Sequence, residues 1–178
     1  MNRQPTLASE LVELRPLREE DRADLARIAG DEQLWEQHPV KTRWKPEVFT
    51  PFFNEALSHE GALVAIDRPS GRIAGSSQYR PTSFDGNAIE IGWTFIAREH
   101  WGSGFNAEMK RLMLRHALES VPRVLFRVGA SNWRSRKAME KIGGRLTDLT
   151  QEVEHGGQVL RHVVFEITRE DFAKGPLS

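Results

Sequence analysis

Residues 88–119 read AIEIGWTFIAREHWGSGFNAEMKRLMLRHALE. The segment begins with the alternating apolar residues typical of a strand, passes through the turn Gly102-Ser103-Gly104, and continues with the spacing of an amphipathic helix. Glycines let the backbone approach a ligand closely, and the unpaired N–H groups at the start of a helix attract anions. The segment therefore predicts a phosphate-binding turn. A plain strand-to-helix connection is the alternative, because short glycine patterns also occur by chance.

The composition limits the classes of protein to which the chain can belong. Its 178 residues favour a single domain over 1–178, and its 25 basic and 25 acidic residues give no net charge that would attract nucleic acid or an anionic membrane. The absence of cysteine excludes disulfides, thiolate metal sites and a cysteine nucleophile. The six histidines lack metal-site spacing, and no apolar run resembles a signal peptide or the roughly 20 residues that span a bilayer. We expect a cytoplasmic protein with no metal, nucleic-acid or membrane partner.

Hydrophobic periodicity and turn residues predict the order β-α-α-β-β-β-α-β-α-β-β. The predicted strands cover 12–17, 62–67, 72–79, 88–95, 123–129, 146–154 and 159–167. The predicted helices cover 19–29, 47–59, 105–119 and 132–142, with a terminal helical turn at 168–173. The fold class is therefore α/β with a mixed sheet of about seven strands.

Polar residues stand at the starts of the two later helices. Asn106 follows the glycine turn, where it either caps the helix or bonds to a ligand. Asn132 offers the same two alternatives at the next helix, where Ser135 shares a face with apolar residues and its hydroxyl needs a partner. The rest of that helix is basic at Arg134, Arg136, Lys137 and Lys141, which indicates a solvated face or a clamp for a nucleotide phosphate.

Two segments resemble one known family. EIGWTFIAREHWGSGFNAEMKRLML (90–114) is similar to the acetyl-CoA-binding strand, loop and helix of the GCN5-related N-acetyltransferases (GNAT), and ASNWRSRKAMEKIGG (130–144) resembles their Asn-x-x-Ser segment. The Trp-Gly-x-Gly form is most similar to the RimJ/RimL-type branch of ribosomal-protein N-terminal acetyltransferases. The resemblance covers about residues 12–167 and implies a splayed, mostly antiparallel sheet.

The resemblance also implies an acetyl-CoA site. The backbone of the turn would hold the pyrophosphate, the strand would bond to the pantetheine arm, and the second helix would contact the thioester. The residues implied for this ligand are Thr94, Phe95, Ile96, Trp101, Gly102, Ser103, Gly104, Phe105, Asn106, Asn132, Ser135 and Arg136.

Some residues depart from the family pattern. Trp101 stands where most members have Gln or Arg, and Asn106 where Gly or Ala is usual. Met139 occupies the position of a tyrosine that serves many relatives as general acid, and Tyr79, the one tyrosine of the chain, lies on another predicted strand. Protonation of the departing thiolate would then depend on Ser135 or water. The departure at Met139 raises the alternative of a non-catalytic acetyl-CoA-binding or regulatory module.

The implied reaction is attack of an amine on the acetyl thioester, which requires a base. Glu90, on the strand that leads to the turn, is the residue we expect in this role, although an alternating strand places charges on a solvent face about as often. An α-amine with a pKa near 8 needs about 1 unit of help at neutral pH, whereas a lysine near 10.4 needs more than about 3. A peptide N-terminus or small amine is therefore favoured as acceptor.

The acceptor would enter beside the irregular Trp- and Pro-containing segment that follows the first helix. Residues that could line its groove are Trp35, His38, Arg43, Trp44, Tyr79 and Glu90. The alternative for the two tryptophans is that they only pack the connection between helices. The resemblance is compatible with a homodimer, which no sequence feature indicates.

Overall fold

An eight-stranded sheet forms the centre of the structure, a computed structural model that describes residues 1–178. The strands lie in the order β1-β2-β3-β4-β5-β6-β8-β7. They are β1 (Leu7–Ala8), β2 (Val12–Pro16), β3 (Ala62–Asp67), β4 (Arg72–Pro81), β5 (Ala88–Ile96), β6 (Arg123–Gly129), β7 (Arg145–His155) and β8 (Gln158–Thr168). The helices are α1 (Arg22–Ala29), α2 (Pro46–Ser58), α3 (Phe105–Ser120), α4 (Trp133–Lys141) and α5 (Arg169–Lys174). Short 3-10 helices cover Glu19–Asp21, Glu32–Trp35 and Arg98–His100.

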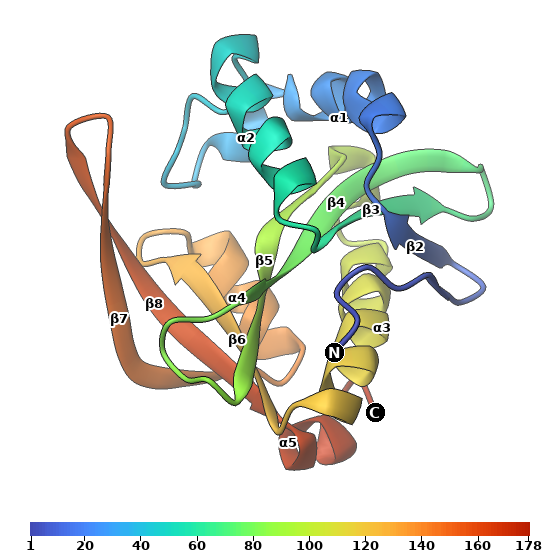
Figure 1. Cartoon of the computed structure of the whole chain (residues 1–178), viewed down its shortest axis with the longest axis vertical. Helices are drawn as coiled ribbons and strands as arrows, with labels where there is room; N and C mark the ends of the chain where they lie inside the picture. The colour runs from blue at the N-terminus through green and yellow to red at the C-terminus, as the bar shows by residue number, and fades with distance from the viewer.

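The two faces of the sheet carry separate hydrophobic clusters, and Figure 1 shows α1 and α2 apart from α3. A cluster of 13 buried residues packs α1 and α2 against the sheet through side chains such as Phe53 and Phe95. A cluster of 24 buried residues packs α3 on the other face. The apolar stripe of α3 is buried throughout: Phe105, Met109, Leu112, Met113 and Ala117. This arrangement leaves the N-terminus of α3 beside the end of β5.

The predicted α/β class and order of elements are confirmed, with small differences at the ends of elements. The expectation of about seven strands omitted β1, whose two residues are too few to show periodicity. The helix expected from residue 19 begins as a 3-10 turn and becomes α-helical at Arg22. None of the helices combines the length and the apolar character needed to cross a membrane.

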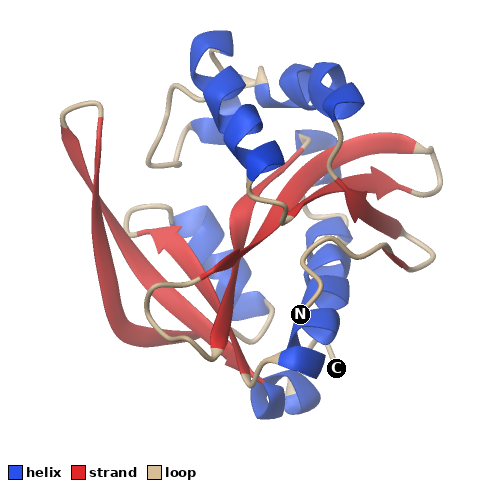
Figure 2. Cartoon of the chain, in the orientation of Figure 1, coloured by secondary structure: helices blue, strands red, loops and turns tan.

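Strands β5 and β6 are parallel and separate after a short paired segment. Pairing joins Ala88–Glu90 to Arg123–Leu125 and ends there, while β6 remains paired with β8 as far as Gly129. Figure 2 shows the two strands diverging from this point. The main-chain groups of β5 beyond Glu90 therefore have no strand partner on the β6 side and need partners of another kind.

A β-bulge interrupts β5 inside the diverging region. Gln78 lies opposite Gly92 and Ser76 opposite Phe95, so two residues of β5, Trp93 and Thr94, face one residue of β4. Trp93 has a φ of 52°, in the left-handed region that is uncommon for residues other than glycine. Bulges redirect side chains and are frequent next to active sites.

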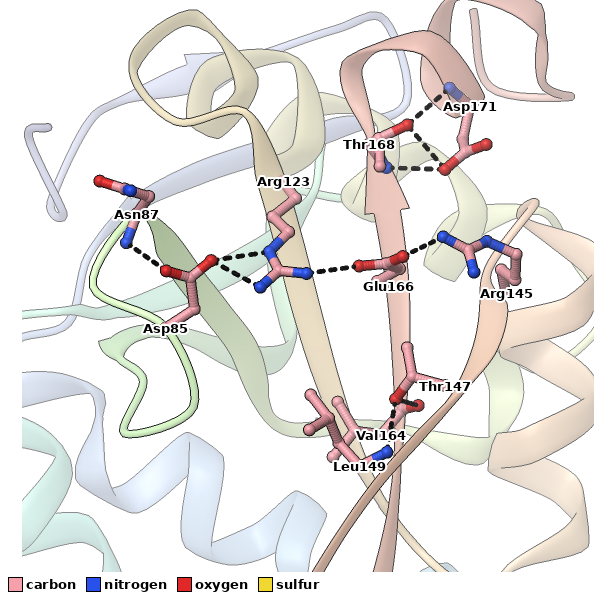
Figure 3. A network of polar contacts seen from close by, with 10 residues as sticks. All are labelled: Asp85, Asn87, Arg123, Arg145, Thr147, Leu149, Val164, Glu166, Thr168 and Asp171. Atoms are coloured by element: carbon pink, nitrogen blue, oxygen red, sulfur yellow. Dashed lines mark hydrogen bonds and ion pairs between the residues drawn. The ribbon is translucent and has the colours of Figure 1, made fainter.

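A network of ion pairs joins the segments around β5 and β6 at the end where the two strands are still paired (Figure 3). The Arg123 guanidinium on β6 lies 2.6 Å from the Asp85 carboxylate before β5 and 3.1 Å from the Glu166 carboxylate on β8. Glu166 also pairs with Arg145 on β7. The network links the β4–β5 loop to β6, β8 and β7. It therefore stabilises the position of β5 relative to β6 at the place where the two strands begin to diverge.

Candidate functional site

A cavity of about 630 Å³ lies where β5 and β6 diverge. Its walls come from β5, β6, the turn and first turns of α3, α4, and the segment around Trp35 and His38. Nine of the residues predicted to bind the donor line it: Thr94, Phe95, Ile96, Trp101, Gly102, Gly104, Asn106, Asn132 and Ser135. The structure therefore brings the two sequence motifs to one space.

Three residues predicted for the same ligand lie outside the cavity. Phe105 is buried in the core, because it is the first residue of the apolar stripe. The Ser103 hydroxyl donates to the carbonyl of His100 at 2.7 Å and accepts from the N–H of Phe105 at 3.3 Å. The Arg136 side chain stacks on Trp133 at 4.4 Å and donates to the carbonyl of Ala130 at 2.9 Å. These side chains stabilise the turn and α4 rather than facing the ligand space.

The turn before α3 presents unpaired N–H groups. Gly102 and Gly104 have φ values of 73° and 86°, in the left-handed region that favours glycine. A side chain at either position would meet only open space, so the backbone conformation, and not a lack of room, explains the two glycines. The N–H groups of Gly102, Gly104, Asn106 and Ala107 have no acceptor within the protein, and no side chain caps the helix at Gly104. Such a helix start attracts an anion.

The charge of the cavity is of one sign. No aspartate or glutamate lines it, whereas Lys110, Arg127, Arg134, Lys137 and Lys141 do. In a chain with equal numbers of acidic and basic residues, this separation makes the cavity suited to a ligand with several negative charges.

Asn106 does not cap α3. The capping position belongs to Gly104, and the Asn106 Oδ1 is buried without a hydrogen-bond partner. Asn106 is a residue of the cavity wall, and because a buried polar atom needs a partner, its Oδ1 is an unsatisfied hydrogen-bond acceptor. The capping alternative for this residue is wrong.

Helix α4 begins at Asn132, whose Oδ1 accepts from the N–H of Ser135 at 3.2 Å. Here the capping alternative is confirmed, and Asn132 is also in the cavity wall. Ser135 shares that wall with Met139, and its hydroxyl has no partner within the protein. The predicted face of α4 therefore borders the cavity at Ser135 and also reaches the core, where Met139 is buried.

A tryptophan and an arginine close one edge of the cavity. Trp101 is 42 % exposed, and its Nε1 donates to the carbonyl of Ile96 at 3.3 Å. The Arg134 guanidinium of α4 lies 4.2 Å from the centre of the Trp101 ring. This cation–π contact joins the turn to α4.

Glu90 is buried beside the cavity but is not part of its lining. It is 4 % exposed and accepts from Nε of Arg127, which lines the cavity, at 3.1 Å. A side chain added at Gly92, another lining residue, would meet Glu90 Oε1 at 3.7 Å. Burial raises the pKa of the Glu90 carboxyl, and the positive charge of Arg127 opposes that rise. A raised pKa makes the carboxylate a stronger base than an exposed glutamate.

The residues predicted for the acceptor separate into two groups. Trp35 and His38 line the cavity. Trp35 also packs the helix connection, since it is buried and its Nε1 donates to the carbonyl of Ala29 at 2.7 Å. Burial, with a smaller contribution from Arg43, lowers the pKa of His38 to about 3, so its imidazole is neutral and a weak base at neutral pH.

Arg43, Trp44 and Tyr79 lie outside the cavity. The Arg43 guanidinium packs 4.3 Å from the ring of Phe52, and Trp44 packs on the cluster beneath α2. Tyr79 is fully buried under α3, where its hydroxyl donates to the carbonyl of Met113 at 2.8 Å. The expectation that Tyr79 faces the acceptor is therefore wrong, because its side chain belongs to the core on the α3 face.

Lys110 is a buried, charged cavity residue that the sequence analysis missed. It lies one turn after Asn106 on α3, is only 2 % exposed, and lines the cavity. Its Nζ donates to Oγ1 of Thr94 at 2.6 Å and to Oγ of Ser77 at 3.0 Å. Its position three residues before Met113, on the apolar stripe, was the one signal available in the sequence.

Comparison with protein families and with solved structures finds similar proteins for this chain. Residues 12–145 match the family described as acetyltransferase (GNAT) domain. A search of curated proteins finds no match.

Solved structures with this fold share little sequence with the chain. A GCN5-related N-acetyltransferase from Brucella melitensis has a TM-score of 0.82 and 19% identity, over 96% of this chain and 81% of that one. RimJ from Mycobacterium smegmatis, in complex with CoA-disulfide, has a TM-score of 0.71 and 20% identity, over 97% of this chain and 90% of that one. Spermidine N-acetyltransferase from Vibrio cholerae, in complex with CoA and spermine, has a TM-score of 0.70 and 15% identity, over 93% of this chain and 100% of that one.

Proposed function

The chain belongs to the GNAT acetyltransferase family, and from this premise we propose that it moves an acetyl group from acetyl-CoA directly to a primary amine of low basicity. A peptide or protein N-terminal α-amine, or a small amine, is the acceptor. The observation that carries the proposal is the cavity between β5 and β6, which has unpaired N–H groups at one end, cationic side chains and no carboxylate. A thioester attached to a pyrophosphate matches those features in charge and in hydrogen bonding.

The donor occupies this cavity along its length. The unpaired N–H groups of Gly102, Gly104, Asn106 and Ala107 bind the pyrophosphate. The main chain of Thr94, Phe95 and Ile96, which has no strand partner on the β6 side, bonds to the amides of the pantetheine arm. The unpaired Oδ1 of Asn106 accepts from a ligand amide.

Glu90 acts as the base. The amine nitrogen attacks the thioester carbonyl, the C–S bond breaks with its electron pair on sulfur, and the proton lost from nitrogen passes to Glu90. Because Glu90 lies behind Gly92 and Arg127 rather than in the wall, a water molecule carries the proton between them. A single buried carboxylate suits an amine whose pKa is about 8 better than a lysine near 10.4.

The function is tested by binding and turnover in one sample. Calorimetry measures acetyl-CoA binding, and release of free thiol is then followed with peptides that have free N-termini, the same peptides with blocked N-termini, and small amines. We expect binding, and thiol release only with free α-amines or small amines. Release with blocked peptides that contain lysine would overturn the acceptor class.

Two other outcomes separate the parts of the proposal. Binding without thiol release from any amine would favour the non-catalytic module, an alternative supported by Met139 at the position of the family's tyrosine. Failure to bind acetyl-CoA would overturn the assignment of the cavity.

Ser135 donates a hydrogen bond to the departing sulfur in this proposal, since its hydroxyl faces the cavity without a partner. We expect Ser135→Ala to reduce kcat about tenfold, because hydrogen bonds to charged groups contribute about 1.5–3 kcal/mol. Acetyl-CoA affinity should be nearly unchanged by calorimetry. The exposed Ser131, just before the start of α4, supplies the matched control Ser131→Ala. Undiminished turnover in Ser135→Ala would remove this role and leave the assignment of the cavity intact.

A further inference from the structure

Lys110 is a buried cation without a counter-ion. Its Nζ has two hydroxyl partners, Thr94 and Ser77, and no carboxylate partner. An ammonium group has three donors, so one N–H is left without a partner inside the protein. A buried charge is costly unless it is paired. The unmatched charge therefore points to a ligand that brings negative charge to this place.

The residues around Lys110 supply no negative charge, which favours a negative charge that develops on the ligand. On β4 and β5 it meets Ser77 and Thr94, and on β6 the ring of Phe126, 5.9 Å from Nζ. The α4 side of the cavity presents Ser135 and Met139 together with the cations Arg134, Lys137 and Lys141. The other charged or titratable lining groups are Arg127, His38, His100 and His162. None of them contributes to the shift of the Lys110 pKa, whose cause is burial alone.

The position of Lys110 relates it to the sulfur end of the donor. Its Nζ donates to the side chain of Thr94, which lies in the bulge of β5. Thr94 is also the first of the β5 residues proposed to bind the pantetheine arm. It lies one turn further into α3 than Asn106, and thus one turn beyond the helix start proposed for the pyrophosphate. It shares the cavity with Ser135, which is proposed to face the sulfur.

We propose that the Lys110 ammonium stabilises the CoA thiolate as the C–S bond breaks and then gives it a proton. The inference rests on the proposed function, because it requires a thioester in the cavity. The electron pair of the broken C–S bond stays on sulfur, Nζ–H transfers its proton to that sulfur, and neutral Lys110 regains a proton from solvent. Lys110 would thus act as the general acid, the role of the tyrosine that many relatives have at the position of Met139.

The acidity of Lys110 is consistent with this step. An ordinary lysine, with a pKa of about 10.4, is a weaker acid than an alkyl thiol of about 8.5, so it would not give up its proton to a thiolate. Burial lowers the pKa of Lys110 to about 7, which makes the transfer favourable. The same burial strengthens the attraction between ammonium and thiolate.

The test is the ionisation of the thiol of bound CoA, followed by the ultraviolet absorbance of the thiolate between pH 6 and pH 10. We expect the thiolate to appear at a pH about one unit lower in the wild-type protein than in Lys110→Met, since a nearby cation lowers a thiol pKa. Lys110→Arg, which keeps the charge, should resemble the wild type in this titration. Lys41→Met removes an exposed lysine outside the cavity and should leave it unchanged.

The outcomes distinguish this inference from the proposed function. Calorimetry first establishes that CoA binds to each variant; absence of binding to the wild type would overturn the proposed function itself. If CoA binds and the thiolate appears at the same pH in wild type and Lys110→Met, Lys110 does not face the sulfur and the inference is wrong. Acetylation of Lys110 after incubation with acetyl-CoA, detected by mass spectrometry, would also overturn it, because an acetylated lysine has neither the charge nor the proton.

Discussion

Replacing Glu90 by glutamine should reduce kcat/KM for the amine about 100-fold, which is the lower part of the range for loss of a general base. Glutamine keeps the size of the side chain and can still accept from Arg127, but it cannot take a proton. Acetyl-CoA affinity should change little, because Glu90 is not in the cavity wall. Steady-state thiol release and calorimetry on the same preparations measure the two quantities.

The pH dependence gives a second and independent check of Glu90. A base must be deprotonated, so wild-type kcat/KM should fall as the pH decreases through the Glu90 pKa, which burial raises above its usual value. This acid limb should be absent in Glu90→Gln. Glu55→Gln is the matched control. The Glu55 carboxylate lies on the exposed surface of α2 and also accepts from an arginine, Arg80. Arg80 is the β4 residue opposite Glu90. An equal loss of activity in both variants, with the acid limb retained, would contradict the role of base.

Much of the fold was predictable because local patterns and the final structure agree. Alternation marked β5, the glycine turn marked the start of α3, and the motif beginning at Asn132 marked α4. The nine cavity-lining residues expected for the donor came from the family resemblance, which places them where those elements begin and end. The splaying of the sheet came from the family resemblance, and the strand order was not predicted, since periodicity does not specify which strands pair.

The errors have a common physical cause, which is that a sequence pattern does not specify which side chains of a strand or helix face a ligand and which face the core. Tyr79 was placed near the acceptor, yet it faces α3. The bulge at Trp93 and Thr94 turns the Thr94 hydroxyl toward Lys110. A lysine within a helix is normally assigned to solvent. Lys110 departs from that rule because the diverging strands create a space that is enclosed but not filled by core side chains.

The same buried lysine leads to a large effect on stability. We expect Lys110→Met to be more stable than the wild type at pH 6, by about 4 kcal/mol. Lowering a lysine pKa from 10.5 to about 7 corresponds to roughly 1.4 kcal/mol for each unit, and the loss of the hydrogen bonds to Thr94 and Ser77 offsets about 1 kcal/mol of that gain. Methionine fills a similar volume with no charge.

The sign of the effect depends on pH in a defined way. Between about pH 7 and pH 10.5 the unfolded wild-type chain binds the Lys110 proton more tightly than the folded protein does, so wild-type stability rises with pH in this window. The advantage of Lys110→Met should therefore be full below pH 7 and nearly absent above pH 10.5. Urea unfolding of both proteins at pH 6 and pH 10 measures the difference, and the other lysines, present in both, cancel. A variant less stable than the wild type at pH 6 would show that the hydroxyl partners outweigh the cost of burial. The lowered pKa of Lys110 would then be wrong, and with it the reason that this lysine can give its proton to a thiolate.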